Sequence, residues 1–552
     1  MANSVKDLNE GNVLDGLAID FSTGDTVDSL QISGVVLEAR TLEPAQAMLV
    51  GVYNNDADSS ITTTRFHRIT KTNKQCEFTV RNLPAGTYSV YAVNDVSRDY
   101  KWDRSEDVAF LGYTVTPASE AVESNDTLRG STGEDSIVAK TKYVTKPNDL
   151  LLTWFNEGYK AQYLQDYKRP QANMLSLIMA APSDSLPELT VIKANSDTLR
   201  RPLRHASLLS RNLTADTLQY WLTDSVLIKA DTMLVETRYR RVDSLEQLTW
   251  RTDTLKFNFR TPKQQPQAQP RKHKRRDEGA DTAEVAPKRP TISLRFDIEG
   301  KQHLNQPLTF RVEQPLRGID TAGVRLELLT DSVWGAVERQ PRVELVDSAC
   351  LLRYKVDYPW KSARRYRMVV DSLAAVNIYG IDNDPIAQEF DTYATDDYSN
   401  ISLSLSNLPD SAVAIVELLN SSEKVVATTP ARGNSANFRY ILPGDYYLRL
   451  FIDADGNGEY TTGHLSAGER RQPEDVYYFS KKLKVKKNWD IQQAWDLNEL
   501  PVDKQKPMDI RKNKPDQKPG EQSDTTDDDE DDDDEAANFG RGLTSSSSSR
   551  RR

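Results

Sequence analysis

The chain has 552 residues, of which 28% are charged and 38% apolar, a composition typical of soluble globular proteins with room for about three to five domains. The formal net charge of −11 is largely local, because residues 527–535 form an unbroken acidic run and the rest of the chain is close to neutral. The single basic cluster, at residues 271–276, lies in a predicted linker, so the composition argues against a nucleic-acid-binding protein.

In chain order, the first segment reads as the end of a domain. Residues 17–22 alternate like a strand, but no partner strand precedes them, and one strand cannot fold alone. Over residues 30–117, short alternating runs are separated by Gly, Pro, Asn and Asp clusters, a spacing typical of a β-sandwich. Residues 118–148 are polar with little periodicity and are predicted to form a linker.

The remainder of the chain alternates between strand patterns and polar segments. Residues 149–260 carry a second β pattern, in which Asp-Ser or Asp-Thr turn signals recur before apolar residues. Residues 261–290 are rich in Gln, Pro, Lys and Arg without an aromatic residue, which predicts a disordered linker or a loop insertion. Strand patterns return over residues 291–395 and 396–500. The tail, residues 501–552, is Lys/Pro-rich, then acidic, then Ser/Arg-rich, and is predicted to be disordered.

Two distant stretches share one plan, in which a turn with proline and glycine leads into an alternating strand and then into an acidic loop. Alignment of the two stretches puts Asp95 on Asp453, and residues 414–419 match residues 48–53 upstream. A correspondence held over this distance predicts two copies of one domain.

Both copies resemble the prealbumin-like, or carboxypeptidase regulatory-like, β-sandwich through the turn that precedes the alternating strand. Residues 291–395 resemble the SbsA-type bacterial Ig-like domain through the stretches 366–372 and 378–384. Residues 7–24 look like the last strands of another such domain, so the segment 1–29 is interpreted as its remnant. The implied fold is all-β, with tandem Ig-like and prealbumin-like β-sandwich domains, a disordered linker and a disordered tail.

The order of these domains resembles that of a family of Ig-like-domain proteins of Gram-negative envelopes. Typical members begin with a lipoprotein signal and a complete Ig-like domain. This chain begins with neither, and no signal peptide opens it, which we interpret as an N-terminal truncation. The resemblance implies a location in the cell envelope or at the cell surface, in the outer membrane or periplasm. Since no stretch reaches 18 apolar residues, no transmembrane helix is expected.

The sequence offers no motif of a known catalytic site. None of the five histidines lies in an H-E-x-x-H pattern, and the chain has no G-x-S-x-G elbow, P-loop or Rossmann glycine fingerprint. The two cysteines, Cys76 and Cys350, are far apart, which excludes a disulfide-stapled scaffold and a Cys-based zinc site. We therefore predict that the chain is not an enzyme.

The later acidic loop matches the first half of a calcium-binding loop. Alternating oxygen donors can surround a hard cation, and glycine permits the sharp turn. The predicted Ca²⁺ ligands are Asp453, Asp455, Asn457 and Glu459. His464 occupies the position of the usual closing glutamate, so Glu469, Glu474 or Asp475 would have to complete the shell.

The earlier acidic loop is a weaker Ca²⁺ candidate, because Tyr100 stands where the motif has glycine. Its predicted ligands are Asp95, Asp99 and Glu106. The alternative interpretation of both loops involves no metal: each is an exposed turn whose Asp and Asn side chains bond to their own backbone.

The function predicted from these features is that of a non-catalytic structural or interaction protein of the bacterial envelope, with an unidentified envelope protein or glycan as partner. The first alternative is a carbohydrate- or peptidoglycan-binding module that uses aromatic residues on a sandwich face. The candidate platform consists of Tyr446, Tyr447, Tyr477, Tyr478 and Trp489. The second alternative is a set of accessory domains of a hydrolase, with two carboxylates facing each other across a cleft.

Overall fold

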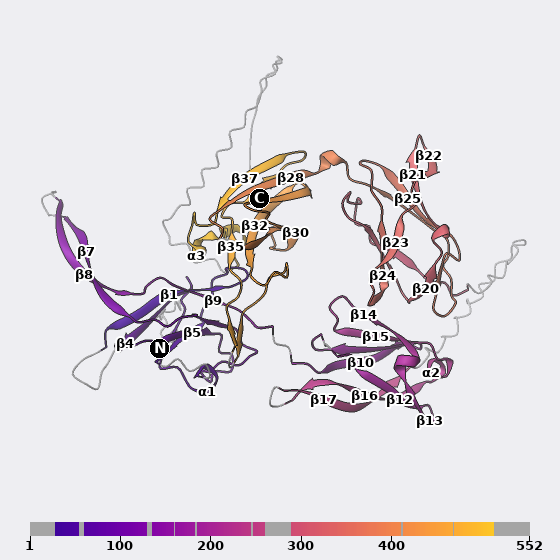
Figure 1. Ribbon diagram of the computed structural model, residues 1–552, viewed down its shortest axis with the longest axis horizontal. Helices are drawn as coiled ribbons and strands as arrows, with labels where there is room; N and C mark the ends of the chain where they lie inside the picture. The colour runs from indigo at the N-terminus through magenta and orange to yellow at the C-terminus, as the bar shows by residue number, and fades with distance from the viewer. Residues whose placement is uncertain are drawn as a thin grey trace, which may run out of the picture. The chain divides into compact units, whose positions relative to one another are not determined.

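The computed structural model describes residues 28–54, 60–129, 135–158, 161–182, 185–243, 247–259, 289–409, 412–466 and 469–512 (Figure 1). Nearly all regular elements in these ranges are β-strands, which confirms the predicted all-β class. The predictions made for the N-terminal remnant up to residue 27, for the linker at 261–288 and for the tail beyond residue 512 lie outside the described residues.

The first sandwich is built from a three-stranded sheet in the order β4-β1-β9 and a four-stranded sheet in the order β3-β2-β5-β6. Its strands are β1 (Leu30–Glu38), β2 (Leu49–Tyr53), β3 (Arg68–Lys71), β4 (Glu77–Leu83), β5 (Ser89–Val93), β6 (Val108–Phe110) and β9 (Leu150–Trp154), with a helical turn α1 (Ser60–Thr63). Between the sheets lies a core that includes Ile32, Val50 and Val90, all nearly inaccessible to solvent.

Strand β9 belongs to this first sandwich, although the sequence pattern assigned it to the opening of the second domain at residue 149. β9 pairs in parallel with β1, so that Leu150 lies opposite Gly34. The backbones approach so closely that a Cβ on Gly34 would lie 2.0 Å from the carbonyl oxygen of Leu150. A parallel pairing between strands so far apart in sequence leaves no local signal, which explains the misplaced boundary.

Residues 118–148, predicted to form a linker, contain a long antiparallel hairpin instead. Its strands are β7 (Ala118–Arg129) and β8 (Asp135–Lys146), and their register runs from Ala118 opposite Lys146 to Arg129 opposite Asp135. A hairpin whose sequence is mostly polar shows no apolar alternation, so periodicity cannot reveal it. We refer to β7 and β8 as the arm.

The second and third sandwiches share one topology. Counted in chain order within each sandwich, and with the short β20–β26 pair left out, the strands run 1-2-6-5 in one sheet and 4-3-7-8 in the other. The second sandwich contains β10 (Leu164–Gln171), β11 (Met174–Met179), β12 (Glu188–Ala194), β13 (Asp197–Pro202), β14 (Ser207–Arg211), β15 (Thr217–Leu222), β16 (Thr232–Val242) and β17 (Leu248–Asn258), with η1 (Leu203–His205) and α2 (Ser225–Lys229).

In the third sandwich, the pair β20 and β26 is added to the same plan. Its elements are β18 (Leu294–Phe296), β19 (Leu308–Val312), β20 (Leu316–Ile319), η2 (Thr321–Gly323), β21 (Val324–Thr330), β22 (Val333–Ala336), β23 (Arg342–Asp347), β24 (Cys350–Asp357), β25 (Arg365–Val370), β26 (Ala375–Asn377) and β27 (Ile386–Asp391). Tyr366 and Trp360 pack edge to face in its core, with ring centroids 5.4 Å apart. A short turn, η3 (Thr395–Asp397), leads into the fourth sandwich.

The fourth sandwich repeats the strand order of the first, with sheets β31-β28-β37 and β30-β29-β32-β35. Its strands are β28 (Ser399–Ser406), β29 (Val413–Leu419), β30 (Val425–Pro430), β31 (Ser435–Ile441), β32 (Gly444–Asp453), β33 (His464–Ser466), β34 (Glu469–Arg471), β35 (Val476–Tyr478), β36 (Leu483–Val485) and β37 (Asp490–Asp496). The turns also correspond: the hydroxyl of Tyr88 donates to the carbonyl of Pro84, and that of Tyr446 donates to Leu442.

Residues 501–512 are ordered, so the prediction of a disordered tail from residue 501 onward is wrong for this segment. It contains α3 (Val502–Gln505) and η4 (Met508–Ile510), and Gln505, Lys506 and Ile510 are buried. The Gln505 amide donates to the carbonyls of Leu497 and Leu500. The segment is anchored by polar side chains that find buried partners, and a composition-based argument cannot anticipate these contacts. We call it the C-terminal strap.

Candidate functional site

The acidic loop after β32 is closed by its own backbone. Asp453 Oδ1 accepts hydrogen bonds from the backbone N–H groups of Gly456 (2.8 Å) and Asn457 (3.1 Å), and Oδ2 accepts one from Gly458 (2.9 Å). Gly456 and Gly458 adopt φ angles of 74° and 77°, a left-handed conformation that glycine adopts without strain. The loop therefore wraps around one buried carboxylate.

Glu474 closes the loop from the opposite side. Its Oε1 accepts from the N–H of Ala454 (2.8 Å), and its Oε2 accepts from the N–H of Thr461 (2.9 Å). Single ligand oxygens from Asp453, Asp455 and Glu474 lie within 4.8 Å of one another, the one such grouping of His, Cys, Asp or Glu in the described ranges. Glu474 was one of three residues expected to complete the shell.

The cluster gathers three carboxylates, and Arg471 is close enough to act electrostatically on one of them, Asp455. The pKa of Asp455 is lowered, chiefly by the hydrogen bond from the Thr461 hydroxyl (2.7 Å), so this carboxylate is ionised at neutral pH. Asp453 Oδ1 already accepts two backbone bonds, whereas Asp453 Oδ2 and the two oxygens of Glu474 each accept one of the bonds described above, so a lone pair on these oxygens can face a hard cation. Of the other two predicted ligands, Asn457 lies beside the group, because its amide donates to Asp455 Oδ2 at 3.1 Å while its Oδ1 accepts from the N–H of Glu459. Glu459 is exposed and is not part of the group.

The earlier loop has the same internal construction. Glu106 accepts hydrogen bonds from the backbone N–H groups of Val96 and Asp103, which follow Asp95 by one and eight residues. Glu474 accepts from the residues at the same two spacings after Asp453. Tyr100, at the position of Gly458, also has a positive φ, of 64°. Asp95, Asp99 and Glu106 are not brought together as a metal-ligating group within the described residues.

The predicted aromatic platform is not present as a surface. Tyr446, Tyr447 and Tyr478 are buried, and Tyr477 is partly buried. Trp489 alone is exposed, with Lys486 Nζ 5.3 Å from its ring centroid. The prediction fails because both faces of β32 are covered, one by the core of its own sandwich and the other by residues of the first sandwich.

The covered outer face reveals an interface that the sequence did not indicate. Leu37 and Cys76 of the first sandwich pack in one apolar cluster with Ile415 and Phe451 of the fourth. In return, Leu465 from the β33–β34 hairpin packs among aromatic residues of the first sandwich. The first and fourth sandwiches thus each bury part of an outer sheet face against the other.

Two arginines and a glutamate form the first half of a charged network within this interface. Glu417 on β29 forms ion pairs with two arginines. Arg449 Nε of β32 lies 2.6 Å from its Oε2, and Arg40 Nη2 of the first sandwich lies 2.7 Å from its Oε1. The aligned positions in the first sandwich are Gly51 and Tyr91, which lie opposite each other as Glu417 and Arg449 do. There the Phe66 ring fills the space of the missing side chain, since a Cβ on Gly51 would lie 2.3 Å from it.

The C-terminal strap contributes the second half of the network. Lys506 Nζ lies 2.7 Å from Glu43 of the first sandwich and 2.7 Å from Glu423 of the fourth, and the lysine side chain is fully buried. These contacts are ion pairs rather than directed hydrogen bonds. The Tyr478 hydroxyl joins the two halves, because it donates to Glu423 (3.0 Å) and accepts from Arg449 (3.3 Å).

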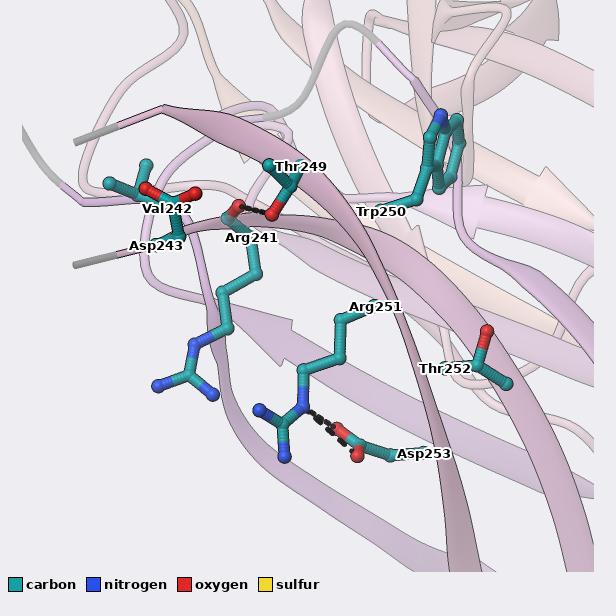
Figure 2. Close-up of a pocket in the computed structure, with 8 residues that line it drawn as sticks. All are labelled: Arg241, Val242, Asp243, Thr249, Trp250, Arg251, Thr252 and Asp253. Atoms are coloured by element: carbon teal, nitrogen blue, oxygen red, sulfur yellow. Dashed lines mark hydrogen bonds and ion pairs between the residues drawn. The ribbon is translucent and has the colours of Figure 1, made fainter. Parts of the chain in front are cut away.

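An open concavity lies at the end of the β16–β17 hairpin (Figure 2). Its lining residues are Arg241, Val242, Asp243, Thr249, Trp250, Arg251, Thr252 and Asp253. Arg251 is paired with Asp253 at 2.9 Å, and Figure 2 shows Trp250 directed away from these two side chains. The charged residues of this lining are Arg241, Asp243, Arg251 and Asp253, and it contains neither histidine nor cysteine.

No protein-family model and no curated protein matches the chain. Solved structures with similarity include BcpA, the major pilin subunit of Bacillus cereus, at 7% identity over 84% of this chain and 98% of that chain, with a TM-score of 0.14. The FN1–FN3 domains of chicken CNTN1 match at 12% identity over 59% of this chain and 99% of theirs, with a TM-score of 0.13. The T6 backbone pilin of serotype M6 Streptococcus pyogenes matches at 9% identity over 81% of this chain and 80% of that chain, with a TM-score of 0.12.

At these TM-scores the matches carry no inference about what this chain does. A separate observation concerns membranes: none of the helices in the described ranges combines the length and the apolar content that a crossing requires.

Proposed function

We propose that this chain is a non-catalytic structural or interaction protein of the bacterial cell envelope, in which the first and fourth sandwiches dock as one body. The observation that supports this is the neutral network at their interface. Three cations, Arg40, Arg449 and Lys506, are matched by three carboxylates, Glu43, Glu417 and Glu423.

Such a network favours one docked arrangement over others. An ion that loses its hydration costs several kcal/mol unless a partner replaces the water, so any shift that separates the pairs is strongly disfavoured. The apolar cluster around Leu37 and Ile415 also stabilises the interface through the hydrophobic effect, which is not directional. A body held in this way keeps the ends of a multi-domain chain in a fixed relationship, as a structural role requires.

The alternatives have less support. A sugar platform would need an exposed row of aromatic rings, and four of the five candidates are at least partly buried. A glycosidase acid needs a raised pKa. In the carboxylate cluster the pKa of Asp455 is lowered, whereas burial raises the pKa of Asp475, which is not part of that cluster. The sheet faces that meet at the interface are covered by apolar side chains of the opposite sandwich.

Cell fractionation tests the envelope role. In cells that express the chain from its own gene, we expect the protein in the envelope fraction, where cross-linking of intact cells joins it to an envelope protein or to glycan. Recovery of the protein in the cytosolic fraction, with no such cross-link, would contradict the proposal.

A second proposal concerns the later acidic loop, which we infer binds Ca²⁺ weakly as a structural ion. The convergence of Asp453, Asp455 and Glu474 within 4.8 Å supports it, because two carboxylates of a glycine-containing loop and a third from the segment before β35 suit a hard cation. No bidentate residue occupies the usual closing position, so the expected dissociation constant is on the order of 10⁻⁴ to 10⁻³ M.

A further inference from the structure

The second sandwich holds an open cavity beside the connection from β13 to β14. Residues of β12, β13, η1, β14 and β15 line it. Because β12 and β13 belong to one sheet and β14 and β15 to the other, the cavity lies between the two sheets. Its volume is about 510 Å³, which is within the range of small-molecule binding sites in proteins.

The walls of this cavity are mainly apolar. Leu189 of β12, Leu203 of η1 and Tyr220 of β15 are buried members of the sandwich core. Leu209 of β14 is partly buried and packs against that core. The Tyr220 hydroxyl donates to the carbonyl of Pro187 at 3.3 Å, so the polar end of this ring already has a partner. A ligand that reaches these walls therefore meets mostly hydrocarbon and an aromatic ring.

The third sandwich shows that the shared topology does not by itself make such a cavity apolar. A concavity of about 530 Å³ lies at its corresponding connection, from β22 to β23, but its lining includes the charged residues Arg339, Arg342 and Asp357. Gln340 of that connection also reaches across to β21, where its Oε1 accepts from the backbone N–H of Leu326 at 3.0 Å. The apolar walls are thus specific to the sequence of the second sandwich.

One cation in the lining has no acidic partner. Arg204 of η1 is exposed, its Nε donates to His205 Nε2 at 3.0 Å, and it forms no ion pair with a carboxylate of the described residues. The carboxylate of the lining, that of Glu188, pairs with Arg238 of β16 at 3.2 Å. The cavity therefore combines apolar walls with one uncompensated positive charge.

We propose that this cavity binds a small amphiphile with one apolar chain and one anionic head group. The chain lies against Leu189, Leu203 and Tyr220, where its burial removes apolar surface from water. The head group pairs with Arg204, whose planar guanidinium suits the oxygens of a carboxylate or a phosphate.

The shape of the site favours a small molecule over a protein partner. Stable protein interfaces cover broad surfaces, whereas this site is a cavity between two sheets, the form in which small ligands are bound. The inference goes beyond the proposed envelope role. It is also independent of the docking of the first and fourth sandwiches, because every lining residue belongs to the second sandwich.

Isothermal titration calorimetry on the full chain tests the proposal with two probes, decanoate and decan-1-ol, which share an apolar chain and differ in the charge of the head group. We expect one decanoate to bind per chain with a dissociation constant on the order of 10⁻⁵ to 10⁻⁴ M, as for burial of a short apolar chain. Decan-1-ol should bind about tenfold more weakly, because it cannot pair with the guanidinium. If decanoate does not bind at concentrations up to about 1 mM, the proposal is overturned, and the cavity is left to an apolar side chain of a partner protein.

Arg204→Gln tests the place of the head group. This variant should bind decanoate about tenfold more weakly than the natural chain and should bind decan-1-ol unchanged, because only the charged head loses its partner. Arg200→Gln is the matched control, since Arg200 is an exposed residue of β13 outside the lining, and it should change neither affinity. Equal affinity of the natural chain and Arg204→Gln for decanoate overturns the pairing of the head group with Arg204.

Leu209→Trp tests the place of the chain, because the larger ring fills the cavity and should prevent binding of both probes. Leu213→Trp, at an exposed position between β14 and β15, is the matched control and should keep both affinities. The melting temperature of Leu209→Trp shows whether this variant folds, and if it does not, the Arg204 comparison decides alone. A folded Leu209→Trp chain that binds both probes with natural affinity places the ligand elsewhere and overturns the proposal.

Discussion

Lys506, in the strap that follows the fourth sandwich, places its Nζ 2.7 Å from Oε2 of Glu43 in the first sandwich, and both side chains are buried. The same nitrogen lies 2.7 Å from Glu423 of the fourth sandwich, so one lysine is paired with carboxylates from two sandwiches. Since buried charges are tolerated only when they are paired, this contact depends on the docked state.

Removal of the lysine charge should therefore destabilise the docked body. Lys506→Met removes the lysine partner of both Glu43 and Glu423, and the expected loss is roughly 3–5 kcal/mol in the free energy of unfolding, as for other broken buried pairs. Urea unfolding followed by tryptophan fluorescence measures the effect. Lys504→Met, at an exposed position of the same strap, is the matched control and should stay within about 0.5 kcal/mol of the natural chain. Equal stability of the two variants would show that the buried pairs do not hold the interface.

The Glu417–Arg449 pair should behave as a coupled unit. Glu417→Gln alone leaves two arginines without their carboxylate, and Arg449→Met alone leaves Glu417 with Arg40 only. We expect the double variant to lose less stability than the sum of the two single losses, with a coupling of about 0.5–3 kcal/mol. Additive losses in the same urea experiment would mean that the pair does not interact.

Calcium should raise the melting temperature of the full chain at about 10 mM, because an ion that binds only the folded loop stabilises it by mass action. Asp453→Ala together with Asp455→Ala should abolish the shift. Magnesium should substitute poorly, since it requires a tighter octahedral shell. An unchanged melting temperature with calcium would leave the loop as a turn held by its own backbone bonds.

The junction between the third and fourth sandwiches should weaken in mild acid. His303 lies 4.9 Å from the Tyr393 ring and 6.0 Å from the Tyr398 ring, and partial burial lowers its pKa. A lowered folded pKa means that the unfolded chain takes up the proton first. Neutral His303 therefore makes its full contribution to the free energy of unfolding at pH values above the usual histidine pKa. This contribution is lost as the pH falls through the lowered pKa of the folded state.

The urea midpoint measured at pH 7.5 and 5.5 tests this dependence on His303, with the pH values spanning about the usual histidine pKa. His303→Gln should reduce the decline in acid, whereas His205→Gln, at an exposed position, should leave it unchanged. An equal decline in all three proteins would place the acid-sensitive group elsewhere.

The sequence match between the two copies corresponds to equivalent strands, because it rests on local patterns that both copies share. The match of residues 414–419 with residues 48–53 is realised in the pairing of β29 with β32 and of β2 with β5. Asp453 and Asp455 converge as expected, and Glu474 was among the proposed additions. These features lie within one loop or one hairpin, or rest on a direct sequence comparison.

The features that the sequence did not predict depend on distant partners. Strand β9 pairs with β1, and Lys506 pairs with two glutamates. Both contacts join residues far apart in sequence and leave no periodic pattern in it. Tyr446 and Tyr447 are consecutive in β32 and so point to opposite faces of the sheet, yet the first sandwich covers the outer face that holds Tyr447. Burial against another domain can be recognised only once both surfaces are known.

The reactivity of Cys76 tests docking of the first and fourth sandwiches most directly. Cys76 is 5% exposed, packs in the interface cluster with Ile415 and Tyr478, and has its pKa raised to about 11 by burial. With Cys350 replaced by serine, the labelling rate of Cys76 by a thiol reagent reports the opening of this interface. We predict very slow labelling in the intact chain and labelling faster by about tenfold or more with Lys506→Met, since a loss of 1.4 kcal/mol already changes an opening equilibrium tenfold. Rapid labelling of Cys76 in the folded, unsubstituted interface, at the rate seen with Lys506→Met, would contradict the account.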